Sequence, residues 1–312
     1  MLGDSEVLSA GIALLDRQAR QEPPLHRPTL HHSGYLLVSD PLSLSRYCLE
    51  KGLIQLNPHI ARRLKDMEVK LEKSPSRVPF VFKTDSHSNI GLVRTINEDA
   101  FYVNEKQGLW LVADGMGGHM RGDKASASVI DSVRSFMPFD TLSESIKDLE
   151  TRLLLANNTC RNMYGKKVVG STIALLFAYE SLAVFLWVGD SRIYRLRRGS
   201  MTLLTEDHSL VQERFRRGEI SRDEAQTLPS ANVLTRAIGI HQTLRLEMQS
   251  AVIRSGDRFL ICSDGLYREL TFKEVQTMLN ADSSGDILNT LIQEALDRGG
   301  KDNITGILIN VG

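Results

Sequence analysis

Residues 109–119 read Leu-Trp-Leu-Val-Ala-Asp-Gly-Met-Gly-Gly-His, and this stretch decides the fold. Five consecutive apolar residues, Leu109 to Ala113, predict a short strand that is buried on both faces of a sheet. The strand runs directly into Asp114, so a carboxylate stands at its end, where an open active site would need one. The glycines that follow let the backbone turn sharply and let a carbonyl oxygen approach a metal ion.

Three further aspartates stand beside apolar strands elsewhere in the chain. Each lies at the end or the start of a predicted strand: Asp190 after Val188 and Gly189, Asp264 after residues 258–263, and Asp302 before Ile304. Alone, each aspartate is most simply explained as the opening of a turn. Four together favour convergence at one site, and converging carboxylates repel one another unless a cation neutralises them. Carboxylate oxygens favour hard cations such as Mg²⁺ or Mn²⁺.

The segment 91–99, Gly-Leu-Val-Arg-Thr-Ile-Asn-Glu-Asp, places a cation and two acids just upstream of this strand. The planar guanidinium of Arg94 suits a phosphate group, which it can bind through two parallel hydrogen bonds. Glu98 and Asp99 are candidates for holding metal-bound waters. The competing interpretation is an ordinary surface ion cluster, which would be favoured if the segment stood alone.

Two other chemistries are formally present in the sequence. The loop after Asp114 resembles part of a nucleotide-binding G-x-G-x-x-G motif, but Met120 replaces its last glycine and no Walker lysine follows. Cys262 and Arg268 have the C-x₅-R spacing of cysteine-dependent phosphatases. In that mechanism Asp264 would lie inside the phosphate cradle and repel the substrate, so a buried structural thiol is the favoured interpretation of Cys262.

Taken together, eight short motifs occur in a fixed order along the chain: Gly91, Arg94 and residues 97–100, then residues 112–119, 170–172, 188–192, 204–209, 234–239, 262–265 and 302–305. This ordered set resembles the metal-dependent protein serine/threonine phosphatases of the 2C type, the PPM family. The resemblance covers roughly residues 80–312. Met116 and the overall spacing are similar to the bacterial branch of the family rather than the animal branch.

The resemblance implies an α-β-β-α sandwich of two antiparallel sheets flanked by helices, with a phosphatase domain at 80–312 and an N-terminal extension of unknown role at 1–79. The grouping of strands and helices in the sequence independently favours antiparallel sheets covered by helices. Within the extension, Ile60, Leu64, Met67 and Leu71 recur at helical spacing. We expect this stripe to dock on the protein's own body rather than on a partner.

The resemblance also implies a role for each site residue. Asp114 would bridge two metal ions, Mn²⁺ or Mg²⁺. The Gly115 carbonyl and the waters held by Glu98 and Asp99 would complete one ion, and Asp264 with Asp302 would hold the other. Asp190 with Asp264 corresponds to a third metal site seen in bacterial members. The catalytic residues would be Arg94, which would bind the substrate phosphate, and Asp99.

The implied reaction is direct attack on phosphorus by a water that two cations activate, without a covalent intermediate. Animal members place a histidine, a proposed general acid, where this chain has Met116. A thioether has no proton to donate. The proton for the leaving group must therefore come from His119, from another side chain or from a metal-bound water, and the sequence leaves these three alternatives open.

Composition limits the partners that the chain can have. The 38 Lys and Arg balance the 38 Asp and Glu, so no net field favours nucleic acid or an anionic membrane. Three widely spaced cysteines and the absence of a cationic, apolar leader favour the reducing cytoplasm. We expect phosphorylated proteins as partners, above all a Ser/Thr kinase and its substrates. The alternative function is a catalytically silent scaffold of the same fold that binds phosphoproteins, but all the acids are retained.

Overall fold

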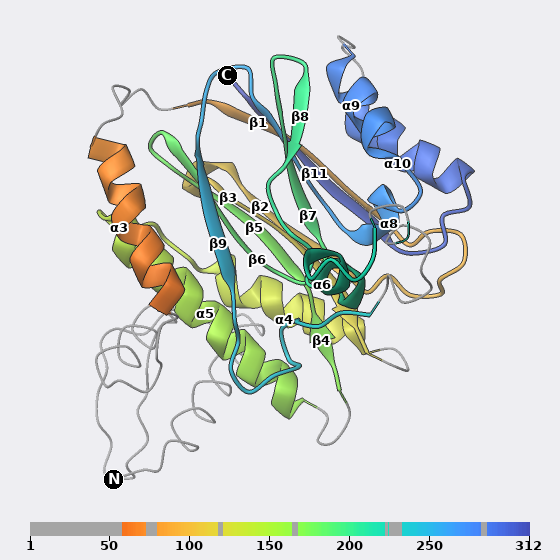
Figure 1. Cartoon of the computed structure of the whole chain (residues 1–312), viewed down its shortest axis with the longest axis horizontal. Coiled ribbons are helices and arrows are strands. Elements are labelled where there is room, and N and C mark those ends of the chain that lie inside the picture. Colours follow the sequence, from red (N-terminus) through yellow and green to blue (C-terminus); the bar gives the residue numbers. More distant parts are fainter. Residues whose placement is uncertain are drawn as a thin grey trace, which may run out of the picture.

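The computed structural model describes residues 58–72, 80–117, 121–163, 168–221, 224, 233–281 and 286–312. Its helices and strands lie in four layers, with two sheets face to face and helices on both outer sides (Figure 1). The α-β-β-α sandwich expected from the sequence is therefore confirmed.

Both sheets contain only antiparallel neighbours among their named strands. The smaller sheet has the order β1-β11-β10-β7-β8, formed by β1 (Phe82–Asn89), β7 (Arg192–Arg197), β8 (Ser200–Leu203), β10 (Arg258–Cys262) and β11 (Ile304–Val311). The larger sheet has the order β2-β3-β5-β6-β9, formed by β2 (Asp99–Asn104), β3 (Leu109–Met116), β5 (Ile173–Tyr179), β6 (Leu182–Val188) and β9 (Glu247–Val252), with the short β4 (Gly170–Ser171) beside β3.

The two sheets share a core made of large apolar side chains. Because side chains alternate along a strand, Trp110 and Val112 of β3 face the other sheet while Leu109 and Leu111 face the helices. The rings of Phe185 and Phe259, one from each sheet, lie 6.1 Å apart between centroids. Strands such as β3 and β6 are thus buried on both faces, which explains their nearly continuous apolar sequences.

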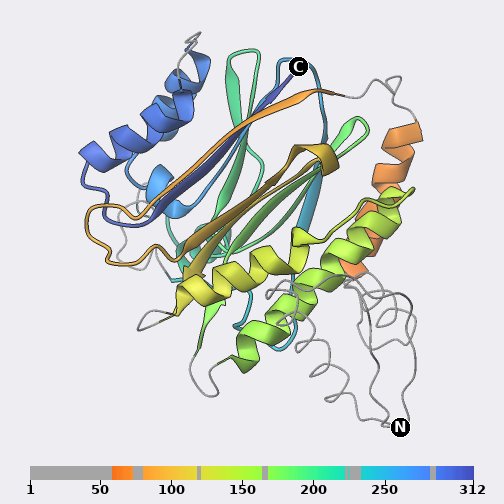
Figure 2. The ribbon, with the colours of Figure 1, turned by 180° about the vertical axis from the view of Figure 1, so that it is seen from behind.

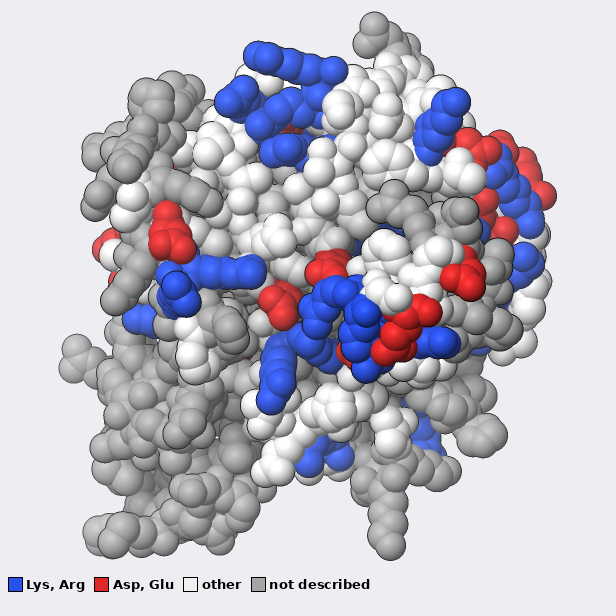
Figure 3. Space-filling view, viewed as in Figure 1, with Lys and Arg blue, Asp and Glu red and all other residues white. Residues whose placement is uncertain are grey.

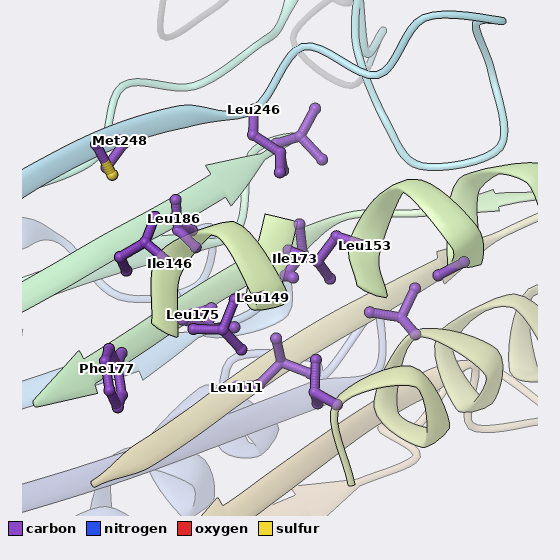
Figure 4. Packing of buried hydrophobic residues seen from close by; sticks show 14 of the residues in the cluster. Leu111, Ile146, Leu149, Leu153, Ile173, Leu175, Phe177, Leu186, Leu246 and Met248 are labelled. Atoms are coloured by element: carbon purple, nitrogen blue, oxygen red, sulfur yellow. The ribbon is translucent and has the colours of Figure 1, made fainter. Parts of the chain in front are cut away.

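Three helices cover the outer face of the larger sheet (Figure 2). They are α3 (Pro58–Glu72), α4 (Gly122–Arg134) and α5 (Leu142–Asn162). Figure 4 shows Ile146, Leu149 and Leu153 of α5 packed over the side chains of Leu175 and Phe177 of β5. This layer fixes the larger sheet from outside and leaves its inner face to the smaller sheet.

The outer face of the smaller sheet carries α8 (Asp264–Tyr267), α9 (Phe272–Asn280) and α10 (Ile287–Asp297). Thr271 and Glu274 form a capping box at the start of α9, with each side chain accepting from the other residue's backbone N–H. A short helix, α6 (Leu210–Arg216), and a 3₁₀ turn, η1 (Glu105–Gln107), lie in connections.

The predicted apolar stripe of the extension lies on α3. Ile60, Leu64 and Met67 are 2%, 3% and 3% exposed, and they belong to the same core cluster as α5 and the larger sheet. Leu71 packs against that cluster. The expectation that this stripe docks on the protein's own body is confirmed.

On the face seen in Figure 3, basic side chains gather near the centre with acidic ones beside them, and a second basic group lies at the top of the view. Among the described residues, no helix is both long enough and apolar enough to cross a membrane.

Candidate metal centre

The strands β3 and β10 belong to different sheets, and both end at the same edge of the space between the sheets. Each of them brings an aspartate to this edge. Asp114 continues the inward-facing positions of Trp110 and Val112, so its carboxylate follows the inter-sheet core at the strand end. Asp264 begins α8 directly after β10. Asp190 lies between β6 of the larger sheet and β7 of the smaller one.

Asp114, Asp190 and Asp264 form a compact group of carboxylates. Each offers one oxygen atom, and these three atoms all lie within 4.8 Å of one another. Asp190 and Asp264 are buried and Asp114 is partly buried. Such an arrangement of oxygen ligands fits a hard divalent cation.

Asp302 lies outside this group of three but close to it. Its Oδ2 accepts a hydrogen bond from Nη2 of Arg94 at 2.8 Å, and its charge contributes to raising the pKa of both Asp114 and Asp264. The sequence placed Asp302 among the chief ligands, ahead of Asp190. In this structure Asp190 lies within the compact group, and Asp302 is held at its edge by Arg94.

Burial dominates the electrostatics of the site. It raises the pKa of the Asp114 carboxyl well above its ordinary value of 3.8, and the charges of Asp99 and Asp264 raise it further. Burial and the charge of Asp190 raise the pKa of Asp264 to about 8. The carboxylates are therefore poorly stabilised as anions by the protein alone, and a divalent cation would supply the missing charge.

Glycines pack backbone against backbone around these aspartates. A Cβ on Gly115 would lie 2.1 Å from the carbonyl oxygen of Gly122, and a Cβ on Gly265 would lie 2.1 Å from the carbonyl oxygen of Asn303. Gly91, with φ of +79°, packs equally tightly on the backbone of Asp302. Gly115 and Gly265, which follow Asp114 and Asp264, thus hold these segments against neighbouring backbone. The sequence interpretation had considered only the glycines after Asp114, for a sharp turn and for approach of a carbonyl to a metal ion.

Asp99 and Glu98, the predicted water-holding acids, occupy different environments. Asp99 lies opposite Asp114 in the β2–β3 register, and its Oδ2 accepts from Ser263 Oγ at 2.7 Å. Burial raises the pKa of Asp99 to about 6 although that hydrogen bond opposes the shift. Glu98 Oε1 accepts from the N–H of Gly122 at 2.8 Å, at the first residue of α4.

Polar side chains that the sequence did not single out hold the strand ends in place. Thr172 Oγ1 accepts from the N–H of Asp114 at 3.0 Å. Asn303 is bonded on both sides of its amide: Oδ1 accepts from the N–H of Glu98, and Nδ2 donates to the carbonyls of Ile90 and Ile96. These residues were visible in the sequence only as members of the ordered motifs.

Two cations contact the acids. Arg94 reaches only Asp302 among the contacts described, and 52% of its side chain is exposed. Arg268 contacts Asp264 and Asp190 with Nη2, at 2.8 and 3.2 Å. In the sequence, Arg268 was interpreted only as part of the rejected C-x₅-R pattern. Its position four residues after Asp264 places the side chains of Arg268 and Asp264 on one helical face.

The Cys262 thiol has the properties of a structural residue. It is 0% exposed, and burial raises its pKa to about 12. A thiol in this environment is protonated at neutral pH and is not a nucleophile. The rejection of a cysteine-dependent mechanism agrees with this observation.

The candidates for the general acid are only partly described. Met116 ends β3 and pairs with Gly170 of β4. His119 lies outside the described residues.

Comparison with known proteins shows which family this chain resembles. A family model described as protein phosphatase 2C matches residues 86–308. The serine/threonine phosphatase stp of Listeria innocua is 32% identical over 243 residues, which is 73% of this chain and 94% of that protein.

Two solved structures are also similar to this chain over most of its length. PppA of Pseudomonas aeruginosa, described as a key regulatory component of T6SS, is 37% identical, with a TM-score of 0.68 over 74% of this chain and 98% of that one. The catalytic domain of the phosphatase PstP in complex with two manganese ions is 29% identical, with a TM-score of 0.67 over 75% of this chain and 99% of that one.

Proposed function

The chain belongs to the protein phosphatase 2C family of metal-dependent serine/threonine phosphatases, and from this premise we propose which of its residues carry the reaction. It hydrolyses phosphoserine and phosphothreonine in proteins with the help of Mn²⁺ or Mg²⁺. We assign Asp114, Asp264 and Asp302, with the Gly115 carbonyl and Glu98, to the two principal metal ions. Asp190 with Asp264 is the pair for a third.

One observation carries the assignment of Asp114, Asp190 and Asp264 to metal ions, whereas Asp302, Gly115 and Glu98 are assigned from the family motifs. Three buried or partly buried carboxylates from different segments place oxygens within 4.8 Å of one another, and the pKa of each is raised. A protein gains no stability from such a group without a cation. When bound, two divalent cations supply a water of lowered pKa and neutralise charge on the phosphate.

We assign the substrate phosphate to Arg94. A guanidinium has five N–H donors, and the contact with Asp302 uses one of them. The remaining donors are accessible because half of the side chain is exposed. Arg94 therefore has the geometry to hold a phosphate at the edge of the carboxylate group while remaining attached to Asp302.

We assign Asp99 to the protein's own support of the reaction centre. It lies opposite Asp114 and is bonded to Ser263, so it links the two sheets beside the carboxylate group. A carboxyl group with a pKa of about 6 can hold or release a proton near neutral pH. The sequence placed Asp99 in catalysis, and its contacts support that proposal.

The natural substrates are phosphorylated proteins, and within that class we propose a Ser/Thr kinase and its targets. The likeness to PppA, described as a regulatory component, supports a role in signalling.

We also propose a cytoplasmic location, since Cys160 and Cys262 are buried free thiols. Cell fractionation followed by a phosphatase assay would test the location, and activity confined to a non-cytoplasmic fraction would contradict it.

The activity and its residue assignments are tested by hydrolysis of a phosphothreonine peptide. We expect release of phosphate with Mn²⁺, none after chelation, and none with Asp264→Asn. Cys262→Ser is the matched control because it changes a buried side chain on the same strand end without removing a carboxylate. Loss of activity in Cys262→Ser with retention in Asp264→Asn would contradict the proposal, and peptide binding without hydrolysis by the wild type would favour the silent scaffold.

We propose that a domain boundary lies between residues 79 and 80, because residues 80–312 contain both sheets and every assigned site residue. Helix α3 precedes that boundary yet docks on the domain.

We expect Leu64→Ala to lower the free energy of unfolding by about 2–4 kcal/mol, since Leu64 is fully buried. Val69→Ala is the control on the same helix, because Val69 is 47% exposed. Equal melting curves for the two variants would show that α3 does not stabilise the domain.

A further inference from the structure

Arg268 directly follows the short helix that begins with a proposed metal ligand. Helix α8 spans Asp264–Tyr267, and the N–H of Arg268 donates to the carbonyl of Asp264 at 3.0 Å. One helical turn therefore separates the two residues, and their side chains leave the same face. The local fold brings a permanent cation beside the carboxylate of Asp264.

The guanidinium of Arg268 bridges two of the three clustered carboxylates. Its Nη2 lies 2.8 Å from Asp264 Oδ2 and 3.2 Å from Asp190 Oδ2. The side chain is 28% exposed, so the contact is partly shielded from water.

A second set of contacts fixes the end of α8. Tyr267 donates its hydroxyl hydrogen to the carbonyl of Asp190 at 3.0 Å. The guanidinium of Arg192 lies over the Tyr267 ring, 3.6 Å from its centroid, and is itself held by Asp207. Tyr267, the residue before Arg268, is therefore anchored to the backbone of Asp190, which keeps the Arg268 side chain within reach of both acids.

The charge balance of the site depends on this contact. Asp190 and Asp264 are the pair that we assigned to a third metal ion. A divalent cation that binds between them would repel the guanidinium and would have to displace it. Arginine stays protonated at every physiological pH, so the guanidinium keeps its positive charge.

From these contacts we propose that Arg268 is a built-in cation that neutralises Asp190 and Asp264 and weakens binding of a third metal ion. The inference rests on the proposed metal-binding function of the acids. Its consequence is a phosphatase that works with two ions at metal concentrations where the third site stays empty. Arg268 is then a residue that sets the number of bound metal ions without contacting the reacting atoms.

The proposal is tested by calorimetric titration of Mn²⁺ into the chelator-treated full chain. We expect two Mn²⁺ ions per wild-type chain at micromolar concentrations. Arg268→Gln and Arg268→Ala should each bind the third ion at least about tenfold more tightly, because a charge in contact with both ligands has been removed. Arg268→Lys, which keeps the charge, should stay closer to the wild type.

Arg134→Ala is the matched control, because it removes an exposed arginine whose partner is Asp131 of the same helix. Unchanged stoichiometry and affinity in both neutral variants would overturn the proposal. So would unchanged Mn²⁺ binding with a raised KM for the phosphopeptide, since Arg268 would then bind substrate. Two neutral variants, each checked by its melting curve, guard against a misfolded sample.

Failure of this inference is distinguishable from failure of the proposed function. If the wild type binds no Mn²⁺, or if Asp264→Asn binds it normally, the assigned metal ligands are wrong. If the wild type binds Mn²⁺ through those ligands and the Arg268 variants match it, only the role of Arg268 is wrong.

Discussion

Asp114→Asn is expected to abolish phosphatase activity and, at the same time, to stabilise the metal-free protein. Activity should fall by at least about 10²-fold, since loss of a single group that stabilises the transition state already costs about 10²–10³-fold. The stabilisation follows from burial, which raises the pKa of Asp114 and so makes its charged form unfavourable in the fold. Asparagine has a similar shape and no charge.

The sign of the effect is set by proton binding. A carboxyl whose pKa is higher in the folded protein than in the unfolded chain holds more protons when folded, so stability decreases as pH rises between the two values. For Asp264 this window runs from 3.8 to about 8, and for Asp99 from 3.8 to about 6. The metal-free wild type should therefore lose stability from acidic to neutral pH, and Asp114→Asn should lose less.

Thermal melts across that window, with and without Mn²⁺, measure the effect. Mn²⁺ should raise the Tm of the wild type and leave that of Asp114→Asn nearly unchanged, because a ligand stabilises only the state that binds it. Asp131→Asn is the control, since that carboxylate is exposed on α4 and its pair with Arg134 is at the surface. A lower Tm for metal-free Asp114→Asn than for the metal-free wild type would contradict the electrostatic explanation.

The second large effect is expected at Gly265, where alanine should destabilise the protein by about 3 kcal/mol or more. The added Cβ would lie 2.1 Å from the carbonyl oxygen of Asn303, closer than carbon and oxygen can approach. Neither segment can easily move. Asn303 is bonded through its side chain to Ile90, Ile96 and Glu98.

Denaturant titration measures this cost, and Mn²⁺ titration of the surviving folded fraction should show weaker binding, because Asp264 is the neighbouring residue. Gly117→Ala is the matched control. Its Cβ would meet the methyl groups of Val169 at 3.4 and 3.5 Å and the Cβ of Arg121 at 3.6 Å, which are ordinary contact distances. Equal stability of the two variants would show that the α8 segment shifts to accept a side chain.

The sequence predicted the buried strands well because their apolar runs are continuous, as in β3 and β6. It did not predict β1, whose sequence Phe-Lys-Thr-Asp-Ser-His-Ser-Asn has a single apolar residue. That strand is at the edge of its sheet, and its inward side chains are satisfied by hydrogen bonds, such as Thr84 with Trp110 and Ser88 with Thr305. Periodicity of apolar residues cannot reveal such a strand.

For the site, position at strand ends identified the four aspartates, but not which of them lie closest together. That depends on tertiary contacts absent from the motifs. Arg94 holds Asp302 at the edge, while Arg268 draws Asp190 toward Asp264. The sequence analysis did not predict the contact between Arg268 and Asp264. It considered the spacing of Arg268 from Cys262, whereas the four-residue spacing from Asp264 places the two side chains on one helical face.

The position of the carboxylates on two different sheets has a kinetic consequence. Asp114 lies two residues before the end of β3 in the larger sheet, and Asp264 follows a strand of the smaller one. An ion bound by both joins the sheets at one edge, much as a crosslink would, so the sheets cannot separate until it leaves. Metal should then slow unfolding itself, and the lifetime of the enzyme at high temperature would be governed by the rate at which it releases its ions.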